Sequence, residues 1–330
     1  MSKLRTALLT AALLASALVP ALVPVMAGAQ GYPAKPIRVI VPFPPGGTSD
    51  ILTRLVGAEL TKSWGQQIVP DNRPGANGNI GVELLARSAP DGYTLALMDV
   101  GNLTTSPVVF AKLPFDIQRD LAPVAMISYS PHLLSIHPAV PARSVKELIA
   151  LAKQRPGKLT YSTGIGGAPH FAGLLFEQRA GIKWLTVPGK GGTQSMLTVI
   201  TGECDVLFLG MLQSVTHARS GKVRALAVSS EKRDAALPEV PTVGETPGLE
   251  GFVTGSWQGV LAPARTPPEI IAKLNAEMTR IVLLPEIREK LASQGTTPLP
   301  MNPPEFGKWL AEQTVRWAKL VKDTGFKFEN

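Results

Sequence analysis

Three glycine-rich turns contain the residues of this sequence that are best placed to bind a small molecule. The turns are VPFPPGGTSD at 41–50, YSTGIGGAPH at 161–170 and VPGKGGTQS at 187–195. Glycines let the backbone approach a ligand closely, and the start of a helix exposes N–H groups and the positive end of the helix dipole. Three helix starts around one cleft would therefore hold a carboxylate without a fixed cationic side chain. A single turn of this kind is more often a simple connection, so the prediction depends on all three.

Residues that could form a catalytic or metal site are few. The chain has neither a Gly-x-Ser-x-Gly nucleophile turn nor a phosphate-binding loop that ends in Gly-Lys-Ser or Gly-Lys-Thr. Its histidines, which lack the spacing of a zinc site, are His132, His137, His170 and His217. His170 follows the second turn at an expected helix start and could face the cleft. We expect no catalytic residue, metal or cofactor, and we keep open a hydrolase that uses His170 with Ser162 or Ser195.

The first residues of the chain have the pattern of an export signal. Lys3 and Arg5 precede an apolar run at 7–26, and small residues follow at 27–29. This pattern predicts a signal peptide, residues 1–29, that is cleaved after Ala29 to release the protein into the periplasm. A retained membrane anchor is the alternative, but Pro20 and Pro24 interrupt the run, and no cysteine stands at the cleavage point to carry a lipid.

Length and charge narrow the class of protein. The chain has 330 residues, of which 45% are hydrophobic, and this is enough for two domains. The formal net charge is +8, and the basic residues are dispersed, which argues against nucleic acid as a partner. Cys204 is the single cysteine, so no intrachain disulfide can form, and its apolar neighbours predict a buried side chain.

Strand-like and helix-like stretches alternate through most of the chain, which predicts parallel sheets flanked by helices. We expect strands at 37–41, 67–69, 94–98, 158–162, 184–187, 205–209, 224–228 and 253–262. We expect helices at 48–63, 79–87, 144–154, 168–179 and 194–201. Three further helices, at 268–283, 286–294 and 304–324, should end the chain without strands between them.

This order of elements predicts two lobes, and the chain passes from one lobe to the other twice. We place the crossings near 129–132 and near 251–257. The first lobe would then contain residues 30–130 and 252–330, and the second lobe would contain residues 131–251.

A set of longer motifs is spread over the chain. They are YPAKPIR at 32–38, VPFPPGG at 41–47, DNRPG at 71–75, APDGYT at 89–94, LPFD at 113–116, PGKL at 156–159, ALAV at 225–228 and LPEVPT at 237–242. With these motifs the chain resembles the Bug family, the extracytoplasmic solute receptors of tripartite tricarboxylate transporters. The resemblance covers nearly the whole mature chain.

The resemblance implies a fold and a function. The fold is the periplasmic-binding-protein type II fold, an α/β "Venus flytrap" with two lobes, a ligand cleft and two crossing strands. The function is to capture a small carboxylate and deliver it to the membrane permease subunits of the transporter, as a monomer and without enzymatic activity. A sensory or scaffold receptor on the same fold is the main alternative, and an exported hydrolase is the other.

The resemblance also implies where the ligand lies. It places contacts in the loop 43–50, in the loop 100–104 and in the glycine-rich turns of the second lobe. The candidate ligand-binding residues are Phe43, Gly46, Gly47, Thr48, Asp50, Gly101, Asn102, Ser162, Thr163, Gly166, Ala168, His170, Gly191, Thr193 and Leu209.

Two departures from the family pattern bear on the identity of the ligand. Gly189 stands where the family usually has Tyr, and Leu209 and Gly210 stand where polar residues are common. A cleft with fewer acceptors should disfavour an ammonium group, so we expect a carboxylate with an apolar or aromatic body. The alternative is an ordinary dicarboxylate, with His170 or Gln213 supplying the missing polar contacts.

Overall fold

The computed structural model describes residues 31–110 and 112–324. Lys35 and the residues after it form one compact unit, and the fold described here is that of this unit. The expected signal peptide, residues 1–29, and its cleavage site after Ala29 lie outside the described residues. In the described part of the chain, no helix is both long enough and apolar enough to cross a membrane.

A ten-stranded mixed sheet runs through this unit. Its strands follow the order β2-β1-β3-β9-β4-β7-β5-β6, and β10 and β8 also pair with β4. The strands are β1 (Ile37–Val41), β2 (Ile68–Asn72), β3 (Thr94–Asp99), β4 (Leu121–Ile136), β5 (Thr160–Thr163), β6 (Leu185–Pro188), β7 (Val206–Gly210), β8 (Arg224–Val228), β9 (Gly255–Pro263) and β10 (Thr297–Met301). β1 is parallel to β2 and β3, and β5 is parallel to β6 and β7. β4 and β9 run antiparallel to each other and to the strands beside them.

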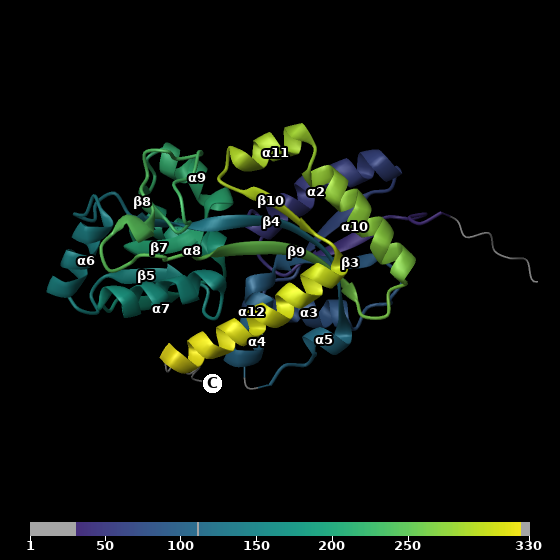
Figure 1. Cartoon of the computed structure of the whole chain (residues 1–330), viewed down its shortest axis with the longest axis horizontal. Helices are drawn as coiled ribbons and strands as arrows, with labels where there is room; N and C mark the ends of the chain where they lie inside the picture. Colours follow the sequence, from purple (N-terminus) through teal and green to yellow (C-terminus); the bar gives the residue numbers. More distant parts are fainter. Residues whose placement is uncertain (1–30, 111, 325–330) are drawn as a thin grey trace, which may run out of the picture. The chain divides into compact units, whose positions relative to one another are not determined.

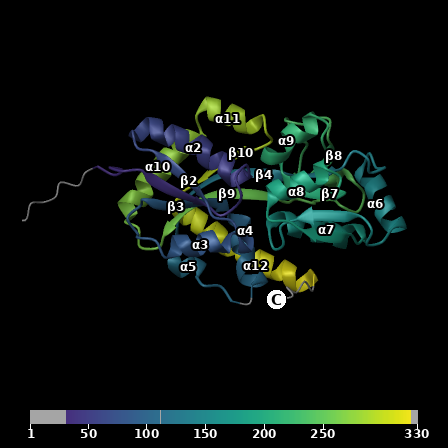
Figure 2. The ribbon, with the colours of Figure 1, turned by 180° about the vertical axis from the view of Figure 1, so that it is seen from behind.

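Helices cover both halves of this sheet (Figures 1 and 2). In the first half of the chain they are α2 (Thr48–Trp64), α3 (Asn79–Ala86), α4 (Val100–Val109), α5 (Ile117–Asp120) and α6 (Val145–Gln154), with a short 3-10 turn, η2, at Ala76–Gly78. The later ones are α7 (Ala168–Ala180), α8 (Gly192–Ile200), α9 (Met211–Arg219), η3 (Val243–Glu245), α10 (Pro268–Val282), α11 (Pro285–Ala292) and α12 (Pro303–Thr324).

Two strands carry the chain from one half of the sheet to the other, as expected. β4 pairs with β9 from Leu121 opposite Pro263 to Pro131 opposite Gly255, and its last residues pair with β7 and β8. We call β1, β2, β3 and β10 with their helices the first lobe, and β5 to β8 with their helices the second lobe. The exact boundaries, at residues 130/131 and 251/252, stay a prediction.

Each lobe has its own apolar core. In the first lobe, strand and helix side chains such as Ile40, Met98 and Phe306 are fully buried together. In the second lobe the core is aromatic, and the Phe176 and Trp184 rings stack with their centroids 5.3 Å apart. Cys204 is 2% exposed, which confirms the buried position expected for it.

The structure corrects the expected elements in several places, and β4, α5 and α9 were not among the strands and helices expected. The sheet is mixed rather than parallel, because β4 and β9 pair antiparallel at its centre. A strand, β10, lies between α11 and α12 where no strand was expected; its two prolines weaken the strand pattern but are tolerated in a short strand with a bulge. Residues 100–104, expected as a loop, are the first turns of α4, whose N-cap is Asp99.

Candidate functional site

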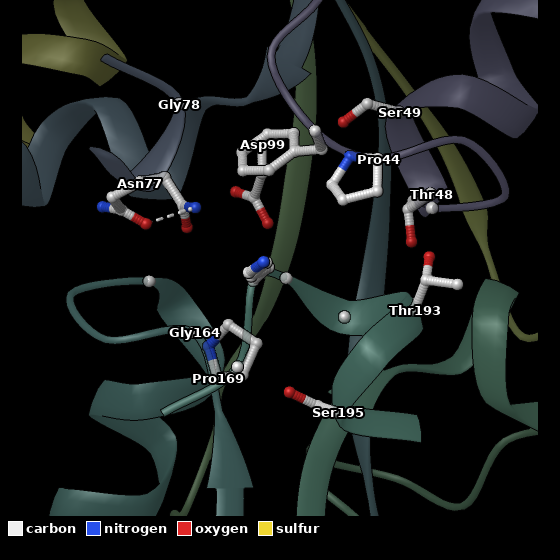
Figure 3. Close-up of a pocket in the computed structure, with 18 of the residues that line it drawn as sticks. Pro44, Thr48, Ser49, Asn77, Gly78, Asp99, Gly164, Pro169, Thr193 and Ser195 are labelled. Carbon is white, nitrogen blue, oxygen red and sulfur yellow. Dashed lines mark hydrogen bonds between the residues drawn. The ribbon is translucent and has the colours of Figure 1, made fainter. Parts of the chain in front are cut away.

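A cavity of about 460 Å³ lies where the carboxyl ends of strands from both lobes meet (Figure 3). Its lining comes from the first-lobe turn after β1, the loop before α3, the start of α4, the three turns before α7, α8 and α9, and the crossing strand β9. This is the position at which open α/β sheets bind their ligands. The glycine-rich turns expected to form the site therefore do meet at one cavity.

The turn after β1 is held in shape by Asp50. Its Oδ2 accepts a hydrogen bond from the Gly46 N–H at 3.0 Å and another from Arg54 Nε at 3.0 Å. Burial would raise the pKa of Asp50, but the hydrogen bonds from Arg54, Gly46 and Asn72 hold it below its ordinary value. Asn72 also donates from Nδ2 to the Phe43 carbonyl at 3.0 Å. Asp50 thus shapes the turn that presents Gly47 and Thr48 to the cavity.

Helix starts converge on the cavity without side-chain caps of their own. The N-cap residues of α2, α8 and α9 are Gly47, Gly191 and Gly210, all three line the cavity, and a glycine has no side chain with which to cap. The first N–H groups of a helix have no partner inside the helix and attract anions, although at the start of α9 the Leu212 N–H already donates to Ser130 Oγ at 3.2 Å. These three starts therefore form a region of positive potential at which a carboxylate can bind.

A buried hydroxyl group lies beside these helix starts. Ser195, in the first turn of α8, is 2% exposed, lines the cavity and, among the described residues, has no hydrogen-bond partner for its Oγ. Its position depends on Gly189, because a Cβ at Gly189 would lie 2.8 Å from that Oγ. A buried hydroxyl is normally hydrogen-bonded, so this one is available to a ligand or an ordered water.

A second polar group of side chains lies on the opposite side of the cavity from α8 (Figure 3). The loop at Gly75–Gly78 has positive φ throughout, including 45° at Ala76 and 57° at Asn77, and it lines the cavity. Asn102 Nδ2 donates to Asn77 Oδ1 at 2.9 Å, and Asn77 Nδ2 donates to the Gly166 carbonyl at 3.0 Å. Backbone in this left-handed region is unusual for non-glycine residues and often marks a functional site.

Asp99 is a buried acid in the cavity lining. It is 7% exposed, and its Oδ1 accepts from the Gly101 N–H at 2.9 Å. Burial raises the pKa of Asp99 to about 6, although hydrogen bonds from Ser256 and from the backbone of Gly101, Trp257 and Asn102 oppose that rise. An Asp at the N-cap of a helix is common, but one buried in a cavity is not explained by capping alone.

The Ser256 hydroxyl connects Asp99 to the crossing strands. Its Oγ lies 3.3 Å from His132 Nε2, and His132 Nδ1 lies 3.0 Å from Thr254 Oγ1. Burial lowers the pKa of His132 to about 3, so this imidazole is neutral at physiological pH. The chain of hydrogen bonds from Asp99 to His132 therefore contains no cation.

The candidate residues from the sequence divide into two groups. Those that line the cavity are Phe43, Gly47, Thr48, Asn102, Thr163, Gly191, Thr193 and Leu209. Those that do not belong to the lining are Gly46, Asp50, Gly101, Ser162, Gly166, Ala168 and His170.

The second group supports the lining from outside it. His170 is 2% exposed, and its Nδ1 accepts from the Gly166 N–H at 3.2 Å, so it braces the turn before α7. Burial lowers the pKa of His170 to about 4. The Ser162 Oγ accepts from Thr198 Oγ1 at 2.9 Å. His170 and Ser162 are thus bonded to other groups and not to each other.

Several residues of the lining were missed from the sequence. They include Asp99, Ser256 and Gln258, whereas Ser49 and Ser195 lie within the predicted turns but were not singled out as ligand contacts. Asp99 could have been found, because an Asp directly after an apolar strand is a helix N-cap signal. Ser256 and Gln258 carried no such signal, since they lie inside a crossing strand. The loop 75–78, which carries the sequence Gly-Ala-Asn-Gly, does line the cavity.

Asp99 bears on whether the cavity can bind an ammonium group. Gly189, Leu209 and Gly210 all line the cavity, as the two departures from the family pattern implied. Asp99, however, supplies a buried acceptor that the sequence-based argument did not include. The expectation that the cleft disfavours an ammonium group therefore loses its basis.

The described residues contain no cluster of three or more His, Cys, Asp or Glu side chains that could hold a metal ion. Lys190 is the other charged residue among those that line the cavity, and its side chain is exposed. The polar part of the site is thus built from backbone N–H groups, hydroxyls, carboxamides and a single buried acid, beside apolar residues such as Phe43, Phe208 and Leu209.

Comparisons with known proteins agree with this architecture. Residues 52–326 match the family model described as "Tripartite tricarboxylate transporter family receptor". Protein BugT of Bordetella pertussis is 36% identical over 303 residues, which cover 91% of this chain and 93% of that protein.

Solved structures give the same result for the fold. R. palustris Rpa4515 with adipate is 32% identical, with a TM-score of 0.87 over 89% of this chain and 98% of that one. The periplasmic binding protein BugD is 30% identical, with a TM-score of 0.85 over 90% of this chain and 100% of that one. The two-lobed fold of periplasmic solute-binding proteins and the resemblance to the Bug proteins are confirmed. The chain belongs to the tripartite tricarboxylate transporter receptor family.

Proposed function

We propose that this protein is a periplasmic receptor that binds a small carboxylate in the cavity between its lobes and passes it to the membrane subunits of a tripartite transporter. The observation that carries the proposal is the convergence of the Gly47, Gly191 and Gly210 helix starts on one cavity, together with the buried hydroxyl of Ser195. This arrangement recognises an anion through hydrogen bonds and helix dipoles. The structure of the relative Rpa4515 with adipate supports a carboxylate as that anion.

We also propose a mature chain, an oligomeric state and a closing motion for this receptor. The mature chain begins at Gln30 after removal of residues 1–29, and it acts as a monomer. Its lobes are residues 30–130 with 252–330, and residues 131–251. They close on the ligand by bending at β4 and β9, as two-domain receptors do.

The proposal also includes the absence of catalysis. A hydrolase would need a serine bonded to a base, but Ser162 bonds to Thr198 and His170 bonds to the Gly166 backbone. His132 lies near Ser256, yet burial lowers the pKa of His132 to about 3, so it is a poor base. A receptor therefore fits the arrangement better than an enzyme.

Native mass spectrometry of the purified protein, followed by calorimetry with a panel of carboxylates, tests the proposal. We expect one carboxylate to bind at one site per chain and to be recovered unchanged after long incubation. Binding of no member of the panel would contradict the receptor function, and conversion of the bound compound would favour an enzyme. The intact mass of the exported protein tests cleavage after Ala29.

A further inference from the structure

Asp99 presents a negative charge to the ligand cavity from the first lobe. Figure 3 shows its carboxylate pointing into the cavity from the side opposite Ser195. Asp99 comes directly after β3 and caps α4, so its position is fixed by two elements. It is 7% exposed, and burial raises its pKa to about 6, so at neutral pH it is mostly ionised.

No cation among the described residues neutralises the charge of Asp99. No ion pair to Asp99 occurs within the described ranges, and the groups that bond it are a hydroxyl and backbone N–H groups. His132, which lies beyond Ser256, is neutral because burial lowers its pKa to about 3. Lys190 lines the rim, but its side chain is exposed. Donors orient a buried carboxylate, but they do not remove the cost of burying its charge.

The helix starts in the cavity lining have the opposite polarity. The starts of α2, α8 and α9 present their positive ends, and the Ser195 hydroxyl is available beside them. A ligand carboxylate is stabilised at those helix starts and repelled near Asp99. A positively charged group is stabilised near Asp99 and repelled at the helix starts.

The two regions therefore select a ligand with both charges. We propose that Asp99 is a specificity-determining residue that binds a protonated amine of the ligand, and that the natural ligand is an amino acid rather than a plain dicarboxylate. This inference rests on the proposed function, because it assumes that the carboxylate of the ligand lies at the helix starts. It differs from what the adipate complex of Rpa4515 alone would suggest.

Calorimetry at neutral pH with four series of ligands of increasing chain length tests which group binds near Asp99. They are ω-amino acids, the matching ω-carboxamides, the matching dicarboxylates and monocarboxylates with a methyl group in place of the amine. We expect the ω-amino acid of the best length to bind about thirtyfold or more tightly than its methyl counterpart, the size expected for a desolvated charge pair. The carboxamide should be intermediate, because it can donate a hydrogen bond but carries no charge.

Asp99→Asn is the test of the residue, because Asn is as good an N-cap as Asp and should keep the start of α4. We expect this variant to lose most of the preference for the amine and to bind dicarboxylates more tightly than the wild type. Asp91→Asn is the control, because it removes the same charge from an exposed turn. It should change neither the preference for the amine nor the affinity for dicarboxylates. Thermal unfolding of each variant shows that it is folded.

Two outcomes would contradict the inference in different ways. If Asp99→Asn weakens all four series equally, or leaves the preference for the amine unchanged, Asp99 does not select the ligand and this inference alone is overturned. If the wild type binds no member of any series, the proposed function is overturned and this inference with it.

Discussion

The carboxamide of Asn102 in the first lobe caps a helix of the second lobe. Its Oδ1 accepts a 3.0 Å hydrogen bond from the backbone N–H of Ala168, the first residue of α7. Thr105 adds a 2.7 Å hydrogen bond to the Gly166 carbonyl in the turn before that helix. Because the N-cap of α7 is Gly167, which has no side chain to cap with, contact between the lobes supplies what the helix itself lacks.

We therefore predict that Asn102 stabilises the ligand-bound, closed arrangement. Asn102→Ala should lower the affinity for a confirmed ligand about fivefold, since a helix cap contributes about 1 kcal/mol. Asn102→Asp keeps the acceptor for Ala168 but loses the donor to Asn77. Its affinity should therefore lie between those of the wild type and of Asn102→Ala. Calorimetry gives the affinities, and small-angle scattering with and without ligand should show less compaction for the alanine variant. Unchanged affinity would mean that the lobes close without this cap.

Replacing Gly46 and replacing Gly47 by valine should have different effects on ligand binding and on stability. The backbone of Gly47 has φ −75°, which valine adopts readily, but its Cβ would point toward Thr193 across the cavity at 3.8 Å. Gly46 has φ +79° with open space around it. We expect Gly47→Val to abolish binding with little loss of stability. Gly46→Val should cost about 1–2 kcal/mol of stability through backbone strain.

Calorimetry and urea unfolding on the same two proteins check this pair. Of these two glycines only Gly46 has positive φ, so backbone strain is expected from Gly46→Val and not from Gly47→Val. Normal ligand binding by Gly47→Val would show that the turn is a connector and not part of the site.

Ser195→Ala should have opposite effects on stability and on binding. Removing a buried hydroxyl that lacks a partner should leave the free protein as stable or up to about 1 kcal/mol more stable. The same change should weaken binding about tenfold if the hydroxyl bonds the ligand carboxylate. Ser293→Ala, which removes an exposed hydroxyl in the first lobe, should change neither. A loss of stability in Ser195→Ala without a loss of affinity would make the hydroxyl structural.

Asp99 should make the free protein less stable at neutral pH than in acid. Burial raises its pKa from 3.8 to about 6, so the folded state binds the proton more tightly than the unfolded state. The stabilisation from protonating Asp99 in the folded state is fully present below pH 3.8. It is lost as the pH rises through about 6, and the free energy of unfolding then falls by about 3 kcal/mol.

Urea unfolding of the wild type and Asp99→Asn at several pH values measures this contribution. The variant should equal the wild type in acid and exceed it by up to about 3 kcal/mol at neutral pH. The buried histidines, which lower acid stability because burial lowers the pKa of His132 and His170, are common to both proteins and cancel in the difference. A difference that does not change with pH would show that Asp99 is not destabilised by burial.

The sequence alone was enough to predict the type of fold and the family. Local patterns determine these features, because an apolar run such as β1 and a helix face such as that of α2 are encoded by neighbouring residues. The same holds for the glycine-rich turns, whose backbone needs are local. Gly47 and Gly191 of these turns both line the cavity, and their contact with a ligand stays a prediction.

The tertiary structure decided which polar side chains face that cavity. Asp99 and Ser195 lie almost 100 residues apart in the chain, and neither has a sequence signal that distinguishes a ligand contact from a cap or a buried hydroxyl. His170 shows the converse, since its place after a glycine-rich turn suggested the cleft, yet its ring braces Gly166. The charge balance of a site depends on burial and on groups brought together by distant strands, and these depend on the packing of the whole chain.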